Sequence, residues 1–318
     1  MTQLYSRFPE IEPFAVHQLR VSALHSLYVE EIGNPRGIPV LFLHGGPGIG
    51  ALPVYRRLFD PQLFHTVLFS QRGAPPSTPV GEVGENDTWQ LVEDIEAVRA
   101  LLGMEHFILF GGSWGSTLAL AYALRHPQPV AALVLRGIFL GRQRELDWLY
   151  RDGASRIFPE AWQEFLTYIP EAERGDLVAA YYRRLMDADP RVHQPAAWRW
   201  AIWEDHLGTL LPGEPTPFTD AGALAIARIE CHYMAHHLFL ETDDYLLREA
   251  HRLQDIPCHI VQGRYDMICP VESALALAQQ LPQAQLHLVA DAGHSSSEPG
   301  ITSELIAALL SLSGQLKF

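Results

Sequence analysis

The 318-residue sequence has little lysine, few cysteines and no long apolar run. Lys317 is the only lysine among 23 basic residues, which face 37 acidic ones, so the formal net charge is −14. A strongly acidic chain is poorly suited to nucleic acids or to an anionic membrane surface, and it favours cationic ligands. We therefore expect neither nucleic acid nor membrane among its partners.

The cysteines and the amino-terminal residues bear on the compartment. Cys231, Cys258 and Cys269 form no CxxC pair and leave one cysteine over, which is typical of a reducing compartment. The segment Met1–Phe14 has no apolar signal core, and no apolar run approaches the roughly 18 residues of a membrane helix. We expect a cytoplasmic protein.

The first 140 residues alternate between strand-like and helix-like segments. A hairpin is expected from residues 15–21 and 26–32. Further strands are expected at 39–43, 66–70, 107–110 and 131–135, with helices at about 86–103 and 115–126. Such alternation predicts parallel βαβ units with helices on both faces of the sheet.

The alternation stops between residues 141 and 240, where the chain becomes helical and aromatic-rich and holds five of its seven tryptophans. It resumes with a strand at 259–262, a helix at 271–281, a strand at 285–289 and a helix at 301–312. We predict a core from residues 1–140 and 241–318, with an inserted helical cap at 141–240. A cap in this position would lie over the carboxyl ends of the strands, where open parallel sheets bind ligands.

The segment around Ser113 has the sequence of a nucleophile elbow. The apolar run Phe107–Phe110 leads into Gly111-Gly112-Ser113-Trp114-Gly115, which fits the pattern G-x-S-x-G, and a run of helix-forming residues follows. The bare pattern also occurs in ordinary glycine-rich turns. Its place between a strand and a helix favours the elbow.

Two further residues complete a catalytic triad. Asp266 follows the next-to-last predicted strand and His294 follows the last one, so the chain order is Ser, Asp, His, as in α/β-hydrolases. Ser113 would attack an acyl carbon, His294 would transfer the proton, and Asp266 would orient the imidazole.

An oxyanion-binding loop is expected at His44-Gly45-Gly46-Pro47-Gly48, directly after the third predicted strand. The N–H groups of Gly45, Gly46 and Trp114 are the candidate donors, and one such donor contributes roughly 2.7–4 kcal/mol to transition-state stabilisation. A simple tight turn is the alternative.

The sequence resembles the proline iminopeptidase (prolyl aminopeptidase) family of the α/β-hydrolase superfamily along nearly its whole length. The loop His44–Gly48 and the segment Gly111–Ser116 are the most specific matches. The other matching segments are 71–73, 77–79, 135–139, 152–156, 203–204, 227–230, 293–295 and 298–300.

The resemblance implies a serine exopeptidase that releases an N-terminal proline from short peptides without cofactor or metal. It implies that Glu204 and Glu230 hold the substrate ammonium, and that Arg136 keeps one of these carboxylates in place. Phe139 and Tyr150 would wall the proline ring. Two carboxylates in a closed pocket are unfavourable until a cation arrives, which would select a free amine.

The sequence departs from the family pattern around the site. Ser70 replaces the usual acidic residue before Gln71, and Ala74-Pro75-Pro76 replaces small and basic residues. Met234 stands where an aromatic residue is common, and Ser297 replaces an aromatic near His294. These changes concern the leaving-group side and the ring pocket.

Alternatives remain open on the sequence. An esterase, lactonase or amidase would share the triad, and a non-catalytic receptor would share the fold. A haloalkane dehalogenase or epoxide hydrolase is disfavoured, because its elbow carries Asp in place of Ser113. A metal site is disfavoured because no HExxH is present, although four residues could be ligands: Glu230, His232, His236 and His237. Cys269 is either a buried apolar residue or a thiol that makes the site sensitive to modification.

Overall fold

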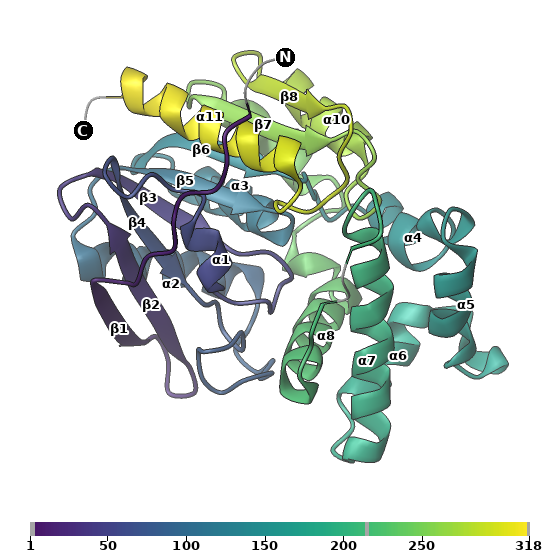
Figure 1. Cartoon of the computed structure of the whole chain (residues 1–318). Helices are drawn as coiled ribbons and strands as arrows, with labels where there is room; N and C mark the ends of the chain where they lie inside the picture. The colour runs from purple at the N-terminus through teal and green to yellow at the C-terminus, as the bar shows by residue number, and fades with distance from the viewer. Residues whose placement is uncertain (1–3, 214–215, 317–318) are drawn as a thin grey trace.

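The computed structural model describes residues 4–213 and 216–316, so that Met1 and Lys317 lie outside the described residues. Within these ranges the strands form one eight-stranded sheet of order β1-β2-β4-β3-β5-β6-β7-β8 (Figure 1). The strands are β1 (Ala15–Arg20), β2 (Ser26–Gly33), β3 (Ile38–Leu43), β4 (Phe64–Phe69), β5 (Phe107–Gly112), β6 (Val130–Arg136), β7 (Cys258–Gly263) and β8 (Gln285–Val289).

The sheet is mostly parallel, as predicted. β1 and β2 form the expected antiparallel hairpin, and β2 also runs antiparallel to β4. All pairings from β4 through β3, β5, β6 and β7 to β8 are parallel. The carboxyl ends of β3, β5, β6, β7 and β8 therefore meet at one edge, where side chains from distant parts of the chain come together.

Helices cover both faces of the sheet, because the central strands are apolar on both sides. In β5, Phe107 and Leu109 belong to one buried cluster, while Ile108 and Phe110 belong to another. The first cluster lies under α2 (Thr88–Leu102), α3 (Trp114–Arg125) and α10 (Val271–Gln280). The second lies under α1 (Pro53–Arg56) and α11 (Pro299–Gln315).

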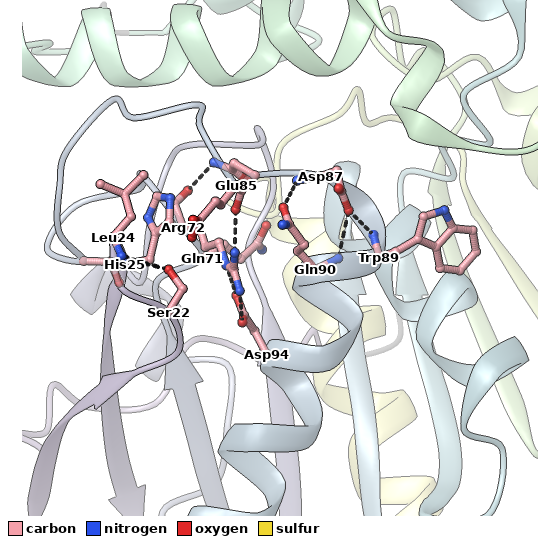
Figure 2. A network of polar contacts seen from close by, with 12 residues as sticks. Ser22, Leu24, His25, Gln71, Arg72, Glu85, Asp87, Trp89, Gln90 and Asp94 are labelled. Carbon is pink, nitrogen blue, oxygen red and sulfur yellow. Dashed lines mark hydrogen bonds and ion pairs between the residues drawn. The ribbon is translucent and has the colours of Figure 1, made fainter.

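The amino terminus of α2 carries a capping box (Figure 2). The Asp87 carboxylate accepts from the backbone N–H groups of Trp89 and Gln90, and the Gln90 side chain accepts from the Asp87 N–H. Beside it, the Arg72 guanidinium donates to both carboxylate oxygens of the buried Asp94 at 2.7 Å. This ion pair holds the loop after β4 against α2.

The chain between β6 and β7 is helical, and Figure 1 shows its helices α4–α8 beside the carboxyl edge of the sheet. Phe165 stacks on Tyr181 at a ring distance of 4.4 Å, and Trp200 and Trp203 are fully buried. The elements are α4 (Gln143–Tyr150), η1 (Ala154–Arg156), α5 (Pro159–Thr167), η2 (Glu171–Glu173), α6 (Leu177–Leu185), α7 (Pro190–Leu207), α8 (Asp220–Ala235) and η3 (His237–Phe239).

The segment that leads from these helices back to the core is hydrogen-bonded to α2. Thr88 Oγ1 donates to the Leu238 carbonyl at 2.5 Å, and Trp89 Nε1 donates to the Phe239 carbonyl at 2.9 Å. The next elements, α9 (Tyr245–Glu249) and η4 (Ala250–Leu253), pack against α3 in the core. This order supports the proposed division of the chain into a core and a cap of residues 141–240.

Candidate active site

Ser113 lies on a sharp turn between β5 and α3, as the elbow motif predicts. Its φ of 58° and ψ of −127° are unusual for a residue with a side chain. The turn closes because its neighbours are glycines. A Cβ on Gly111 would lie 2.1 Å from the Gly115 carbonyl oxygen, and a Cβ on Gly115 would lie 2.2 Å from the Leu43 carbonyl oxygen.

Asp266 and His294 follow β7 and β8 and contact each other at the same edge of the sheet. His294 Nδ1 donates to Asp266 Oδ2 at 2.8 Å. Asp266 Oδ1 accepts from the backbone N–H groups of Ile268 (3.0 Å) and Cys269 (2.7 Å). Gly137 packs against the ring, since a Cβ there would lie 2.9 Å from His294 Cε1. The imidazole is thus fixed with Nε2 directed away from Asp266.

Gln262, which the sequence did not single out, supports this pair. Its Nε2 donates to Asp266 Oδ2 (3.1 Å) and to the Cys269 carbonyl (2.8 Å), while its Oε1 accepts from the Ile138 N–H (3.0 Å). The sequence does contain a signal for this role, because Gln262 is an uncharged polar residue next to Gly263, at the end of a fully buried strand.

The structure corrects the expected role of Arg136. Its Nη1 lies 2.9 Å from His294 Nε2 and also donates to the His294 carbonyl at 2.8 Å. Among the described residues no carboxylate lies within 4.0 Å of its guanidinium. Arg136 ends β6, and its guanidinium packs over Gly112 in the sheet, whereas Glu204 and Glu230 belong to cap helices.

The protonation state of His294 follows from its surroundings. Burial lowers the pKa of His294 from 6.5, and the Arg136 charge lowers it further, while Asp266 acts in the opposite direction. The neutral ring carries its proton on Nδ1, so Nε2 is unprotonated and accepts a hydrogen bond from Arg136.

Hydrogen bonds made by His44 and Gln71 orient the expected oxyanion loop. The Gln71 N–H donates to His44 Nε2 (2.9 Å), so His44 Nδ1 carries the proton and donates to the Gly45 carbonyl (2.8 Å). The His44 carbonyl in turn accepts from Gln71 Nε2 (3.0 Å). In a trans peptide C=O and N–H point in opposite directions, so the N–H groups of Gly45 and Gly46 face away from these partners. Gly45 lies against Ser113.

Gln71 also joins this loop to the elbow, a role that sequence reasoning missed. Its Oε1 accepts from the Trp114 indole N–H at 2.8 Å, so that one amide bonds both segments. Trp114 opens α3, and its backbone N–H has no partner within the helix. Burial lowers the pKa of His44 to about 4, which keeps this network neutral.

Glu204 on α7 and Glu230 on α8 line the same cavity as Ser113, with a volume of about 610 Å³. The Tyr150 hydroxyl donates to Glu204 Oε1 at 2.5 Å, and Trp200 Nε1 donates to Glu230 Oε2 at 2.8 Å. The two acids that the resemblance singled out therefore face the cavity that holds the predicted nucleophile.

The two carboxyl groups share a buried environment that opposes their charge. Burial raises the pKa of Glu204. Burial and the neighbouring Glu204 charge raise the pKa of Glu230 well above its usual range. Without a cation the pair is most stable with a proton between its members, and a bound ammonium would remove that need.

The aromatic residues expected around the proline ring take different positions. Phe139 lines the cavity, as expected, and so does Met234. Tyr150 departs from the expectation: it lies behind Glu204, stacks on Trp200 at 4.7 Å and lines a separate cap cavity of about 440 Å³. Its hydroxyl positions a carboxylate.

The departures from the family pattern have local explanations. The Ser70 hydroxyl donates to the Pro75 carbonyl and accepts from the Ala51 N–H, both at 2.9 Å, so it ties together two loops. Pro75 lines the cavity. Ser297 is exposed, and its hydroxyl contacts that of Ser295.

The four possible metal ligands do not converge. His232 Nε2 contacts the Asn86 carbonyl at 3.0 Å, and its Nδ1 contacts the Tyr182 hydroxyl. Among the described residues, one group of possible ligands has all its ligand atoms within 4.8 Å of one another. It consists of Asp266, Cys269 and His294, in the region of the predicted triad. Burial raises the pKa of the Cys269 thiol well above its usual range, so the thiol stays protonated.

The elbow, the Asp–His pair and the backbone-lined loop define a serine hydrolase with the α/β-hydrolase fold. In agreement, residues 38–300 match the family model described as "alpha/beta hydrolase fold". The solved structures of an esterase from Rhodococcus sp. and of a Mycobacterium smegmatis proline iminopeptidase share this fold. The esterase has a TM-score of 0.63 and 19% identity, and the comparison covers 95% of this chain and 99% of the esterase. The proline iminopeptidase has a TM-score of 0.58 and 18% identity, and the comparison covers 95% of this chain and 98% of that protein.

Sequence relatives define the family more closely. The chain is 51% identical to the Leptolyngbya boryana protein named "Probable proline iminopeptidase", over 97% of this chain and 96% of the relative. It is 48% identical to the Xanthomonas citri proline iminopeptidase, over 95% of this chain and 97% of the relative. The chain belongs to the proline iminopeptidase family. Among the described residues, every helix is too short or too polar to cross a membrane.

Proposed function

We propose that this chain is a prolyl aminopeptidase that releases an N-terminal proline from peptides through an acyl-enzyme. The observation that carries the proposal is the convergence of Glu204, Glu230 and Ser113 on one cavity. A substrate whose ammonium lies between the two carboxylates extends its carbonyl toward the serine. A mid-chain proline has no ammonium and leaves both acids without a partner.

The proposed reaction is acyl transfer in two halves. Ser113 Oγ attacks the prolyl carbonyl while His294 Nε2 takes its proton, and the N–H groups of Gly45, Gly46 and Trp114 stabilise the oxyanion. The C–N bond then breaks, and His294 returns the proton to the departing amine. In the second half water, deprotonated by His294, hydrolyses the ester and releases proline.

The substrate preference tests the proposal. We expect kcat/KM for prolyl-naphthylamide to exceed that for its N-acetylated form by at least about 100-fold, because two charge-assisted hydrogen bonds of roughly 1.5–3 kcal/mol each are lost. Ser113→Ala should lower the rate by about 10⁴-fold or more. A preference for the acetylated amide or for aryl esters would instead support a general esterase or amidase.

We also infer a cytoplasmic location, supported by three cysteines that are free and buried. Short peptides with an N-terminal proline are the proposed partners.

A further inference from the structure

The catalytic cavity has acidic side chains at the cap end and a cation at the sheet end. Apart from His294, Arg136 is the only basic side chain among the described residues that line it. Its bonds to described residues are to His294 Nε2 and to the His294 carbonyl. A guanidinium that faces a substrate cavity without a carboxylate partner is suited to bind an anionic group of the substrate.

The position of Arg136 identifies which part of a substrate it would meet. His294 Nε2 must come within hydrogen-bond distance of the departing amine in order to protonate it. Arg136 Nη1 lies 2.9 Å from that same nitrogen, so it borders the leaving-group side of the scissile bond. The glutamates, on cap helices, face the acyl side.

Two hydroxyl groups lie in the same part of the cavity wall. Tyr55 and Ser296 line the cavity together with Arg136, and all three also border a small adjoining void with Gly45. The side-chain hydroxyls of Tyr55 and Ser296 form no hydrogen bond with any described residue. Arg136 is near enough to Tyr55 for its charge to oppose the rise in pKa that burial causes there. The leaving-group side thus offers one cation and two hydroxyls.

We infer that Arg136 binds the free carboxylate of the residue after proline, and that zwitterionic dipeptides beginning with proline are the preferred substrates. In a dipeptide this carboxylate is attached to the carbon next to the departing nitrogen, which places it within reach of Nη1. In a longer peptide the same position holds a neutral carbonyl, which makes a weaker bond to a guanidinium. The inference rests on the proposed function.

Binding of the carboxylate also frees the catalytic base. Arg136 Nη1 donates one hydrogen to the His294 carbonyl and the other to His294 Nε2. When the guanidinium shifts to bind the substrate carboxylate, its hydrogen bond to Nε2 is lost. Nε2 then becomes available to Ser113, with which it forms no hydrogen bond in the described structure. The carboxylate itself does not react: the C–N bond breaks, and the amino acid departs with the proton from His294.

A pair of dipeptides that differ in one charge tests the inference. We would compare kcat/KM for prolylglycine and prolylglycinamide in the wild type, Arg136→Gln, Arg136→Lys and the control Arg36→Gln, an exposed arginine before β3. We expect the wild type and the control to prefer prolylglycine by about 10-fold or more, the effect of one charge-assisted bond. The ratio should fall to about one in Arg136→Gln, and Arg136→Lys should retain part of it.

Two results would overturn the inference: a wild-type ratio near one, or a ratio that Arg136→Gln leaves unchanged. Because the wild-type ratio is decisive by itself, the test does not depend on the stability of any variant. Hydrolysis of prolyl-naphthylamide distinguishes a failure of the proposed function from a failure of the role of Arg136. If the wild type cleaves it and the dipeptide ratio is near one, only the role of Arg136 is wrong. If the wild type cleaves no prolyl substrate, the proposed function fails and this inference fails with it.

Discussion

At the scale of single residues, Glu230 is the clearest compromise between stability and function. It is 2% exposed, and its bonds are to Trp200 and to Glu204, whose like charge opposes its ionisation. Arg136, which was expected to hold one of these carboxylates in place, bonds His294 instead. A buried carboxylate without a permanent cation costs stability, so the ammonium of the substrate would supply the missing charge.

We expect Glu230→Gln to lower kcat/KM for prolyl-naphthylamide by about 10- to 100-fold, because one charge-assisted bond is lost. The pH profile should change as well. In the wild type the acid limb follows the raised pKa of Glu230, since its protonation removes the ammonium partner as pH falls. In the variant the limb should move to lower pH, toward the lowered pKa of His294. Steady-state kinetics from about pH 5 to 9 measure this, with exposed Glu160→Gln as the control.

The same variant separates recognition from folding. A carboxyl pKa that is raised in the native state contributes stability at low pH, and this contribution is lost as pH rises through the native pKa. Glu230→Gln should therefore melt at a higher temperature than the wild type, and the difference should grow with pH. A lower melting temperature at alkaline pH, or an unmoved acid limb, would contradict the assignment.

At the scale of elements, the site depends on the close approach of β3, β5 and α3. The approach is made through backbone atoms, because Gly115 faces the Leu43 carbonyl and Gly111 faces Gly115. Gln71 then bonds the oxyanion loop after β3 to the first residue of α3. The relative position of the proposed nucleophile and the proposed oxyanion donors is thus fixed by contacts that leave no space for a side chain.

We expect Gly115→Ala to destabilise the protein by about 3 kcal/mol, the upper end of the usual cost of overpacking, because its methyl group would overlap fixed backbone. Gly314→Ala is the matched control. Gly314 lies in α11 with open space around it, so alanine there should stabilise by about 0.5–1 kcal/mol. Urea unfolding measures both, and equal midpoints for the two variants would contradict the packing of the elbow.

At the scale of the whole molecule, the charge of the chain matches the charge of the proposed ligand. The net charge of −14 gives the surface a negative potential, and the cavity is lined by three acidic residues of the cap, Glu204, Asp205 and Glu230. A cationic substrate is attracted by both, whereas a zwitterionic one gains less at long range.

Ionic strength should therefore affect the two substrate types differently. Between about 10 mM and 150 mM salt the screening length falls from about 30 to 8 Å. We expect kcat/KM for cationic prolyl-naphthylamide to decrease over this range, and that for zwitterionic prolylglycine to change less. Equal responses of the two substrates would show that the net charge of the protein does not contribute to binding.

The sequence by itself determined the elements and the candidate catalytic residues, because their signals are local. The Asp87 and Gln90 capping box marks the start of α2, and Gly103, at φ 62°, follows its end. Strand–turn–helix order places Ser113, and parallel strands bring Asp266 and His294 to the same edge. Family resemblance added Glu204 and Glu230, which the sequence pattern alone does not distinguish from surface charges.

Only the tertiary structure decided with which partners the polar side chains form hydrogen bonds. Arg136 bonds His294 rather than a glutamate, and Tyr150 bonds Glu204 rather than lining the cavity. Gln71 connects the loop after β3 to the first residue of α3. Arg136 and His294 are 158 residues apart, and Tyr150 and Glu204 are 54 apart. The direction of a long side chain depends on the packing of whole elements around it, and no sequence interval encodes that packing.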